Sequence, residues 1–485
     1  MKRRSDWKLL VPAIWLSALL PPTLSAQSAS PVKLRLNLPG TALSVHGSDG
    51  NEPQESQAQS AATAPGLTLE QLQRIALANN PTLGQAQAGV RSAAGRTRQA
   101  GLWPNPMVGY TGEEIRGGSF GGGQHGVFVQ QDIILGGKLG LDQRIFAAEG
   151  KQAETELDEQ RLRVENGVRI AFYQLLAAQR MVEIREKLDA LAKDAVLTTK
   201  QLFNVGQADE PDLLQAEVET DEADLAVIAS QQEQRRAWRV LAAMVGKPDL
   251  ALARLEGNLE DLPQIDPEQI TQTILRDSPA VKIAQIGVTR SDATLVRAQR
   301  EVVPDLSLRG GYLNNREQLG TIPPKAVGSE GFVEVGVNLR LFNRNQGNIQ
   351  AARADRERAN LDVQRVSLVL QQLTAPILES YATSRASVDR YKTTTLPNAQ
   401  RAYELYVQRY KEGAAAYPQV LIAQRTLFQL QASYIAGLEE VWTSAVTLQG
   451  LLLTDGLDLP ARPGEVDLPM REINMPVTEV PGASR

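Results

Sequence analysis

The chain has 485 residues, a formal net charge of −5, 22% charged residues and 42% hydrophobic residues, a balance that gives no basic surface for nucleic acid. It has no cysteine, which excludes disulfides and a lipid anchor on cysteine. Only two histidines, His46 and His125, are present, so a histidine-based metal centre or catalytic triad is not expected.

The N-terminal residues 1–26 predict a secretory signal peptide, because basic MKRRSDWK precedes apolar LLVPAIWLSALL and a small residue, Ala26, ends the segment. An uncleaved amphipathic anchor is the alternative. Residues 27–66 predict a disordered leader and residues 458–485 a flexible tail, since both lack apolar periodicity. No later run reaches the roughly 18 apolar residues of a membrane-spanning helix, so a membrane-spanning part would have to be a barrel.

The rest of the chain repeats itself at a spacing of roughly 200 residues. NNPTLGQAQ around Pro81 corresponds to DSPAVKIAQ around Pro279, and the other landmarks follow in the same order. We therefore predict two repeats, at residues 67–258 and 259–457.

Helical periodicity predicts three helices in the first repeat, at residues 68–102, 138–204 and 211–245. At 1.5 Å per residue the middle helix would be about 100 Å long, too long for a globular core. The second repeat predicts the same three helices, at residues 267–300, 345–411 and 418–453. A bend is expected at Pro397. The two shorter helices of each repeat would stack end to end beside the long one as an antiparallel coiled coil.

Each repeat also contains one hairpin, where the periodicity changes to strict alternation of apolar and polar residues. We expect strands at about residues 107–114, 127–133, 306–312 and 332–341. Soluble hairpins packed on helices are the alternative. Four strands per chain leave open edges, whereas three chains would supply twelve strands and close a barrel with its apolar face toward lipid. The sequence thus predicts a mainly α-helical homotrimer with a 12-stranded transmembrane β-barrel and a periplasmic α-helical tunnel.

Small and turn-forming residues lie where each hairpin leads into a long helix. They are Gly136, Gly137, Asn343, Asn345 and Gly347. Such residues permit the unusual backbone angles needed where a strand turns into a helix, so their expected role is geometric.

Two G-x4-P turns align without gaps between the repeats. Gly206 and Gly413 suit helix C-terminal caps, and Pro211 and Pro418 suit the first turn of the next helix. Tracing the chain through the helices puts both turns at the end remote from the hairpins.

These features resemble the outer membrane efflux protein family, also called the TolC family, over about residues 67–457. The resemblance is carried by WPNP before the first strand, by IILGGKLG and LFNRNQGNI at the strand–helix junctions, by the two turns, and by LPNAQRAYELY. FNRNQGNI and the PNP segment are most similar to the outer-membrane subunits of resistance-nodulation-division pumps that export cobalt, zinc and cadmium.

The resemblance implies an outer-membrane protein of a Gram-negative bacterium that extends into the periplasm. It also implies two partners, a periplasmic adaptor (membrane fusion) protein and an inner-membrane efflux pump. The adaptor would dock at the tip turns, with the residues Val205, Gly206, Pro211, Gly413, Tyr417 and Pro418. Asp209 and Glu210 are a candidate cation-selective gate. Alternatively, they only complement the positive start of the following helix.

The expected function is a passive exit duct for heavy-metal cations. No clustered nucleophile, metal-ligand or phosphate-loop motif is present, so we expect neither catalysis nor a cofactor. Other candidate functions are an exit duct for drugs, an exit duct for a type I secreted polypeptide, and a periplasmic coiled-coil scaffold without a pore.

Overall fold

The computed structural model describes residues 66–115, 122–206, 208–320, 323, 325–412, 414 and 416–460. All of them belong to one unit, Ala62–Arg485. The predicted signal peptide, the predicted leader up to residue 65 and the predicted tail from residue 461 onward lie outside the described residues, as does Gly413. The first tail residues, 458–460, are described, and the carboxylate of Asp458 lies 3.7 Å from Arg163 Nη1.

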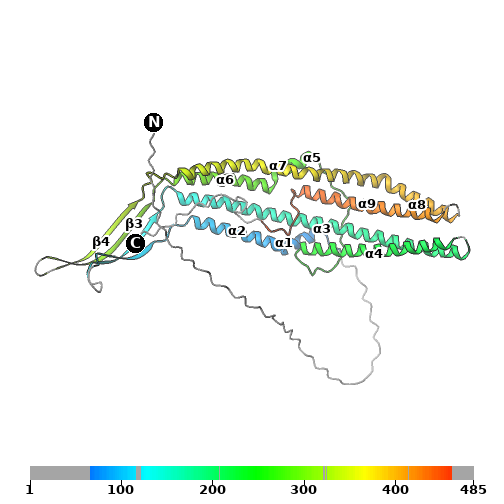
Figure 1. The fold of residues 1–485 in the computed structure, drawn as a ribbon, viewed down its shortest axis with the longest axis horizontal. Coiled ribbons are helices and arrows are strands. Elements are labelled where there is room, and N and C mark those ends of the chain that lie inside the picture. Colours follow the sequence, from blue (N-terminus) through cyan, green and yellow to red (C-terminus); the bar gives the residue numbers. More distant parts are fainter. Residues whose placement is uncertain are drawn as a thin grey trace, which may run out of the picture. The chain divides into compact units, whose positions relative to one another are not determined.

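The same order of elements occurs twice along the chain (Figure 1). The first set is α1 (Leu69–Asn79), α2 (Pro81–Ala100), β1 (Met107–Glu113), β2 (Gln124–Ile133), α3 (Lys138–Asn204) and α4 (Glu210–Met244). The second set is α5 (Pro267–Asp277), α6 (Pro279–Arg300), β3 (Leu306–Leu319), β4 (Lys325–Val337), α7 (Gln346–Arg390), the π-helical segment η2 (Tyr391–Thr395), α8 (Leu396–Lys411) and α9 (Tyr417–Gln449).

The long helix α3 begins and ends at the predicted residues and is about 100 Å long at 1.5 Å per residue. Its counterpart in the second repeat is interrupted by η2, and Pro397 lies in the first turn of α8. The interruption lies next to the predicted bend at Pro397, since proline cannot supply a backbone hydrogen bond and a π-helical turn rearranges those around it.

Two helices that we predicted as continuous are each broken before a proline. The first break is at Asn80, where the backbone is extended, and the second is at Ser278. A residue that precedes proline is disfavoured in a helix, and proline suits the first turn of the next one. The side-chain oxygen of Asn80 accepts a hydrogen bond from Thr82 N at 3.0 Å, which caps α2.

The strands form one antiparallel sheet in the order β1-β2-β3-β4. Pairing between β2 and β3 joins the two repeats and aligns, for example, Val127 with Tyr312. In this sheet β1 and β4 are the edge strands. Edge strands carry free backbone donors and acceptors that can pair with another chain.

The strand boundaries differ from the prediction. β2, β3 and β4 extend further toward the hairpin loops, because ladder hydrogen bonds are made by the backbone and also form in polar sequence. The loop between β3 and β4 is therefore much shorter than the segment 313–331 that separates the two predicted strands. At the other end β4 stops at Val337 rather than 341, because Val337 already pairs with Leu306, the first residue of β3.

The main hydrophobic core ties together helices of both repeats. Leu72 of α1, Leu175 of α3 and Val441 of α9 are fully buried in it. Trp442 of α9 stacks on Tyr173 of α3 with ring centroids 3.7 Å apart. The Trp442 Nε1 donates a hydrogen bond to the backbone carbonyl of Leu259, in the segment between α4 and α5. The two repeats therefore fold as one packed unit.

Candidate functional site

One face of the sheet is apolar and exposed. Residues opposite each other on neighbouring strands share a face, and the register aligns Val108, Val129, Gly310 and Val333 in one row across all strands. The side chains of Val108 and Val333 are 72% and 83% exposed. Exposed apolar surface of this continuity is typical of contact with a membrane or another protein.

Aromatic residues lie at both ends of this apolar band. Within the apolar band, Tyr110 and Tyr312 lie in the row nearest the hairpin loops. The next row toward the loops is polar and contains His125, whose Nδ1 lies 2.5 Å from the Tyr110 hydroxyl. At the helical end Trp103 and Phe342 are both more than half exposed. Apolar bands flanked by aromatic residues are typical of membrane-spanning barrel strands.

The opposite face of the sheet, called the polar face below, carries the charged side chains of the strands, together with Phe128 and Phe332. One of its rows aligns Met107, Gln130, Arg309 and Glu334 across all strands, and the Gln130 side chain donates a hydrogen bond to Ser307 Oγ at 3.3 Å. The predicted separation therefore holds for the rows of Val108 and Gln130, whereas the row of Gly109, Phe128, Gly311 and Phe332 places two aromatic rings on the polar face.

The junction between strands and long helices uses left-handed backbone conformations at equivalent places in the two repeats. Gly137 and Asn345 precede α3 and α7 with φ of 69° and 63°, and Gly136 has φ of 73°. Asn345 also donates a hydrogen bond from its side chain to Ala298 O at 2.8 Å, which ties the junction to α6. These three residues therefore have left-handed backbone angles of the kind that the turn from strand to helix was expected to need.

The other two predicted junction residues do not need such angles. Asn343 instead accepts a hydrogen bond from the backbone N of Asn345 at 3.0 Å. Gly347 lies in the first turn of α7 with nothing near the position of a Cβ. Their prediction was wrong because side-chain capping and ordinary helical geometry already satisfy the turn.

An ion pair between a buried lysine and a partly exposed aspartate, which the sequence did not reveal, holds the same junction. Lys138, the first residue of α3, is 1% exposed, and its ammonium lies 2.8 Å from Asp305, just before β3. The other carboxylate oxygen of Asp305 accepts a hydrogen bond from Leu135 N at 2.9 Å. The sequence feature that could have indicated this ion pair is a charged residue directly after each turn motif, Lys138 in GGK and Asp305 in VPD.

A second ionic network lies one turn further along the helices. Arg297 of α6 binds Asp142 of α3 at 2.7 Å and also pairs with Glu301, which pairs with Arg340 after β4. Burial raises the pKa of the Asp142 carboxyl although Arg297 lies beside it. The junction between sheet and helices is thus held by charge pairs that involve α3, α6 and the segments before β3 and after β4.

At the other end of α3, the first tip turn has the predicted geometry. Gly206 has φ of 73° and follows the C-cap residue Val205, while Pro211 lies in the first turn of α4. Asp209 is the N-cap residue but makes no side-chain capping hydrogen bond. Asp209 and Glu210 are exposed and adjacent at this tip, a placement that fits both predicted alternatives.

The second tip turn differs from the prediction at Tyr417. This residue starts α9, and Pro418 follows it in the first turn. The Tyr417 side chain is 5% exposed and packs against Tyr410 with ring centroids 5.6 Å apart. Burial raises the pKa of Tyr417 to about 12. The prediction of Tyr417 as a docking residue was wrong for its side chain, because helix α9 turns the ring into the protein.

An ionic clasp connects the two repeats near the tips. Arg425 of α9 donates from Nε to Glu219 of α4 at 3.0 Å, and its Nη2 lies 3.5 Å from Glu222. A groove of about 590 Å³ between α3, α4 and α9 lies beside this clasp. No sequence signal links residues 206 positions apart.

Two buried carboxylates lie on one face of α3, two turns apart. Glu149 is paired with Arg96 of α2 at 2.5 Å. Glu156 is 5% exposed, and burial, with Glu159 and Glu149 nearby, raises its pKa to about 7.

Replacing Glu156 with Gln is expected to stabilise the protein at alkaline pH. The raised pKa means that the folded state holds this proton more tightly than the unfolded state, where the pKa is near 4.5. Stability of the wild type therefore falls as the pH rises through this window. Urea unfolding should show a gain of about 2 kcal/mol for Glu156→Gln at about pH 8 and almost none at about pH 4. The exposed variant Glu186→Gln is the control; an equal gain at both pH values would refute this assignment.

Within the described parts of the chain, no group of three or more metal-ligating side chains is placed to hold a metal ion. Among the helices described, none is long and apolar enough to cross a membrane.

Comparison with known proteins agrees with this architecture. A family model described as "Outer membrane efflux protein" matches residues 72–247 and 270–452. The cobalt-zinc-cadmium resistance protein CzcC of Cupriavidus metallidurans is 28% identical over 390 residues, which cover 80% of this chain and 90% of that protein.

Two solved structures share the fold. The CusC structure has a TM-score of 0.66 at 17% identity and covers 83% of this chain and 97% of its own. The outer membrane protein VceC of Vibrio cholerae has a TM-score of 0.64 at 19% identity and covers 80% of this chain and 97% of its own.

Proposed function

The chain belongs to the outer membrane efflux protein family and is an efflux channel protein of the outer membrane, and we propose that three copies form a passive exit duct for heavy-metal cations. The predicted family, location and general function are confirmed. The trimer, the closed barrel, the partners and the substrate are proposals.

The sheet supports the proposal of three copies. It is four strands wide, with β1 and β4 at its edges, and edges of this kind are stable in a membrane only when they pair. Three copies joined edge to edge give twelve strands and a closed barrel. In such a barrel the row with Val108 and Val333 faces lipid, and the row with Gln130 and Glu334 faces water.

The helices support the same assembly. Helix α4 exposes four apolar residues at coiled-coil spacing, namely Leu214, Val218, Leu225 and Ile228. This spacing suits packing against a helix of another copy. Together with the length of α3, it favours a helical tunnel that continues from the barrel.

One observation carries the substrate proposal: the chain matches 90% of the length of a cobalt-zinc-cadmium resistance protein. An inner-membrane pump and a periplasmic adaptor would deliver the cations to the tips, where Val205, Gly206, Pro211, Gly413 and Pro418 are the proposed docking residues. The chain itself would carry out no chemistry.

Deletion of the gene tests this function. The deletion strain should lose tolerance to cobalt, zinc and cadmium salts, and a plasmid copy should restore it. Unchanged metal tolerance together with drug sensitivity, or with loss of one secreted polypeptide, would support the other exit-duct functions. If the protein leaves the cell envelope without detergent and forms no trimers, the scaffold function would replace the duct.

The acidic pair at the first tip gives a further prediction for the gate. The double variant Asp209→Ala and Glu210→Ala removes six charges from a trimer, so cation selectivity should fall severalfold if the pair lines the opening. Reversal potentials of single channels in a salt gradient measure the change. Glu217→Ala, on an exposed position further along α4, is the control. An unchanged reversal potential in the double variant would mean that Asp209 and Glu210 only complement the positive start of α4.

A further inference from the structure

Arg309 is the only Lys or Arg in the strand segments 107–113, 124–133, 306–315 and 328–337. It lies on the polar face of the sheet, directly between Gln130 on β2 and Glu334 on β4. Under the proposed function this face lines the duct, so Arg309 would be the one fixed positive charge in this part of the wall.

Aromatic rings hold the Arg309 guanidinium. Its central carbon lies 4.1 Å from the centroid of the Phe128 ring and 5.6 Å from that of Phe332. Nη1 is 3.5 Å from the Glu334 carboxylate, and Nε is buried without a hydrogen-bond partner. Stacking on aromatic faces stabilises a cation and fixes its position.

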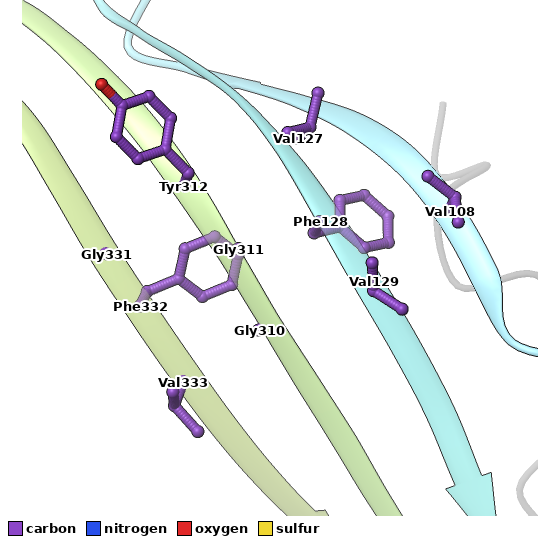
Figure 2. Close-up of a pocket in the computed structure, with 10 residues that line it drawn as sticks. All are labelled: Val108, Val127, Phe128, Val129, Gly310, Gly311, Tyr312, Gly331, Phe332 and Val333. Atoms are coloured by element: carbon purple, nitrogen blue, oxygen red, sulfur yellow. The ribbon is translucent and has the colours of Figure 1, made fainter.

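Glycines make room for these rings close to the sheet. The row next to Arg309 aligns Gly109, Phe128, Gly311 and Phe332. A Cβ at Gly109 would come within 2.5 Å of the Phe128 ring, and one at Gly311 within 2.6 Å of the Phe332 ring. Figure 2 shows the Phe332 ring directed toward Gly311. The rings therefore cover the glycines, and Arg309 is held against the wall.

The partner of Arg309 is less constrained. The side chain of Glu334 is 64% exposed, against 29% for Arg309. Asp132 and Glu330 lie on the same face by register, so carboxylates outnumber the guanidinium. The positive charge is thus fixed, while the negative charges face the solvent.

We propose that Arg309 is a selectivity-determining residue of the duct, whose fixed charge, balanced by Glu334, limits the attraction of the polar face for cations. This inference rests on the proposed function, because it requires that the polar face lines water. Charged groups at a pore wall act on every ion that passes within a few ångströms.

The absence of cysteine makes a direct measurement possible. Gln130→Cys places one thiol opposite Arg309 in the register. Its reaction rates with a cationic and an anionic membrane-impermeant methanethiosulfonate reagent, added to intact cells, report the local charge. Reagents enter from outside, so the helical tips do not limit the measurement.

Adding Arg309→Gln to this background should raise the cationic rate about threefold and lower the anionic rate by a similar factor, since a unit charge roughly 6 Å away acts through water. Glu334→Gln should shift both rates the other way, and Arg309→Lys should keep the wild-type ratio. Arg254→Gln removes an exposed charge outside the sheet and should change nothing. Opposite shifts from two variants cannot arise from misfolding.

Two failures are distinguishable. If the Gln130→Cys thiol does not react while a Val129→Cys thiol does, the polar face does not line water and the proposed duct is wrong. If Gln130→Cys reacts but Arg309→Gln and Glu334→Gln leave the ratio of rates unchanged, the duct stands and the role of Arg309 is overturned.

Discussion

Replacing Asp305 with Ala should lower the free energy of unfolding by about 3–5 kcal/mol. The change leaves the ammonium of Lys138, which is 1% exposed, in the junction without its counter-charge. It also removes the acceptor for Leu135 N. Urea unfolding of the detergent-solubilised protein, followed by tryptophan fluorescence, measures the loss.

A double variant separates the charge effect from general damage. Lys138→Met with Asp305→Ala removes both charges, and it should recover a large part of the stability lost in the single variant, since no buried charge remains unpaired. Arg254→Ala breaks an exposed ion pair with Glu183 and should cost less than about 1 kcal/mol. Additive losses at the two junction positions would show that the pair is not the stabilising contact.

Locking the ionic clasp should abolish export. With cysteines in place of Arg425 and Glu219, a short reducible thiol cross-linker would join α9 to α4, two helices that belong to different repeats. If the tips open by movement of these helix pairs, metal efflux should fall at least tenfold while the proposed trimers stay intact. Reduction of the cross-link should restore efflux. The metal content of loaded cells, followed over time, measures efflux.

The matched control joins two positions on the same helix. Cysteines at Glu219 and Glu222 lie one turn apart on α4, so their cross-link places no constraint between the repeats. This variant should export normally. Continued export by the clasp variant, with cross-linking complete, would contradict a gate formed by these helices.

The elements that sequence predicted best are those with long, regular periodicity. Helix α3 begins and ends where its pattern does, and the alternation in β4 correctly separated the exposed Val333 and Val335 from Glu334. These predictions succeed because helical and strand periods repeat over many residues, and a one-residue shift in a strand would reverse both faces.

Helix breaks and strand ends were harder to predict than the long periodic elements. The breaks at Asn80 and Ser278 each precede a proline, a signal present in the sequence but hidden by apolar periodicity that runs across it. The extra length of β3 and β4 could not be predicted, because polar segments pair through backbone groups that every residue carries.

Contacts distant in sequence were not predictable from one chain. Lys138 and Asp305 are 167 positions apart, and neither residue type at its position specifies the other. The burial of Tyr417 depends in the same way on Tyr410 and Leu421, which the fold brings beside it. Hence the architecture followed from the sequence, while the charge pairs that hold the junction and the tips required the structure.

Cysteine labelling along one strand tests the central claim, that the sheet is a duct wall with water on its polar face and lipid on the other. Three variants, each with one cysteine in place of Val333, Glu334 or Val335, are treated in intact cells with a membrane-impermeant maleimide. The account predicts fast labelling of Glu334→Cys, with both valine positions reacting only with a lipid-soluble reagent. Equal labelling of the three positions, or faster labelling at the valines, would contradict it.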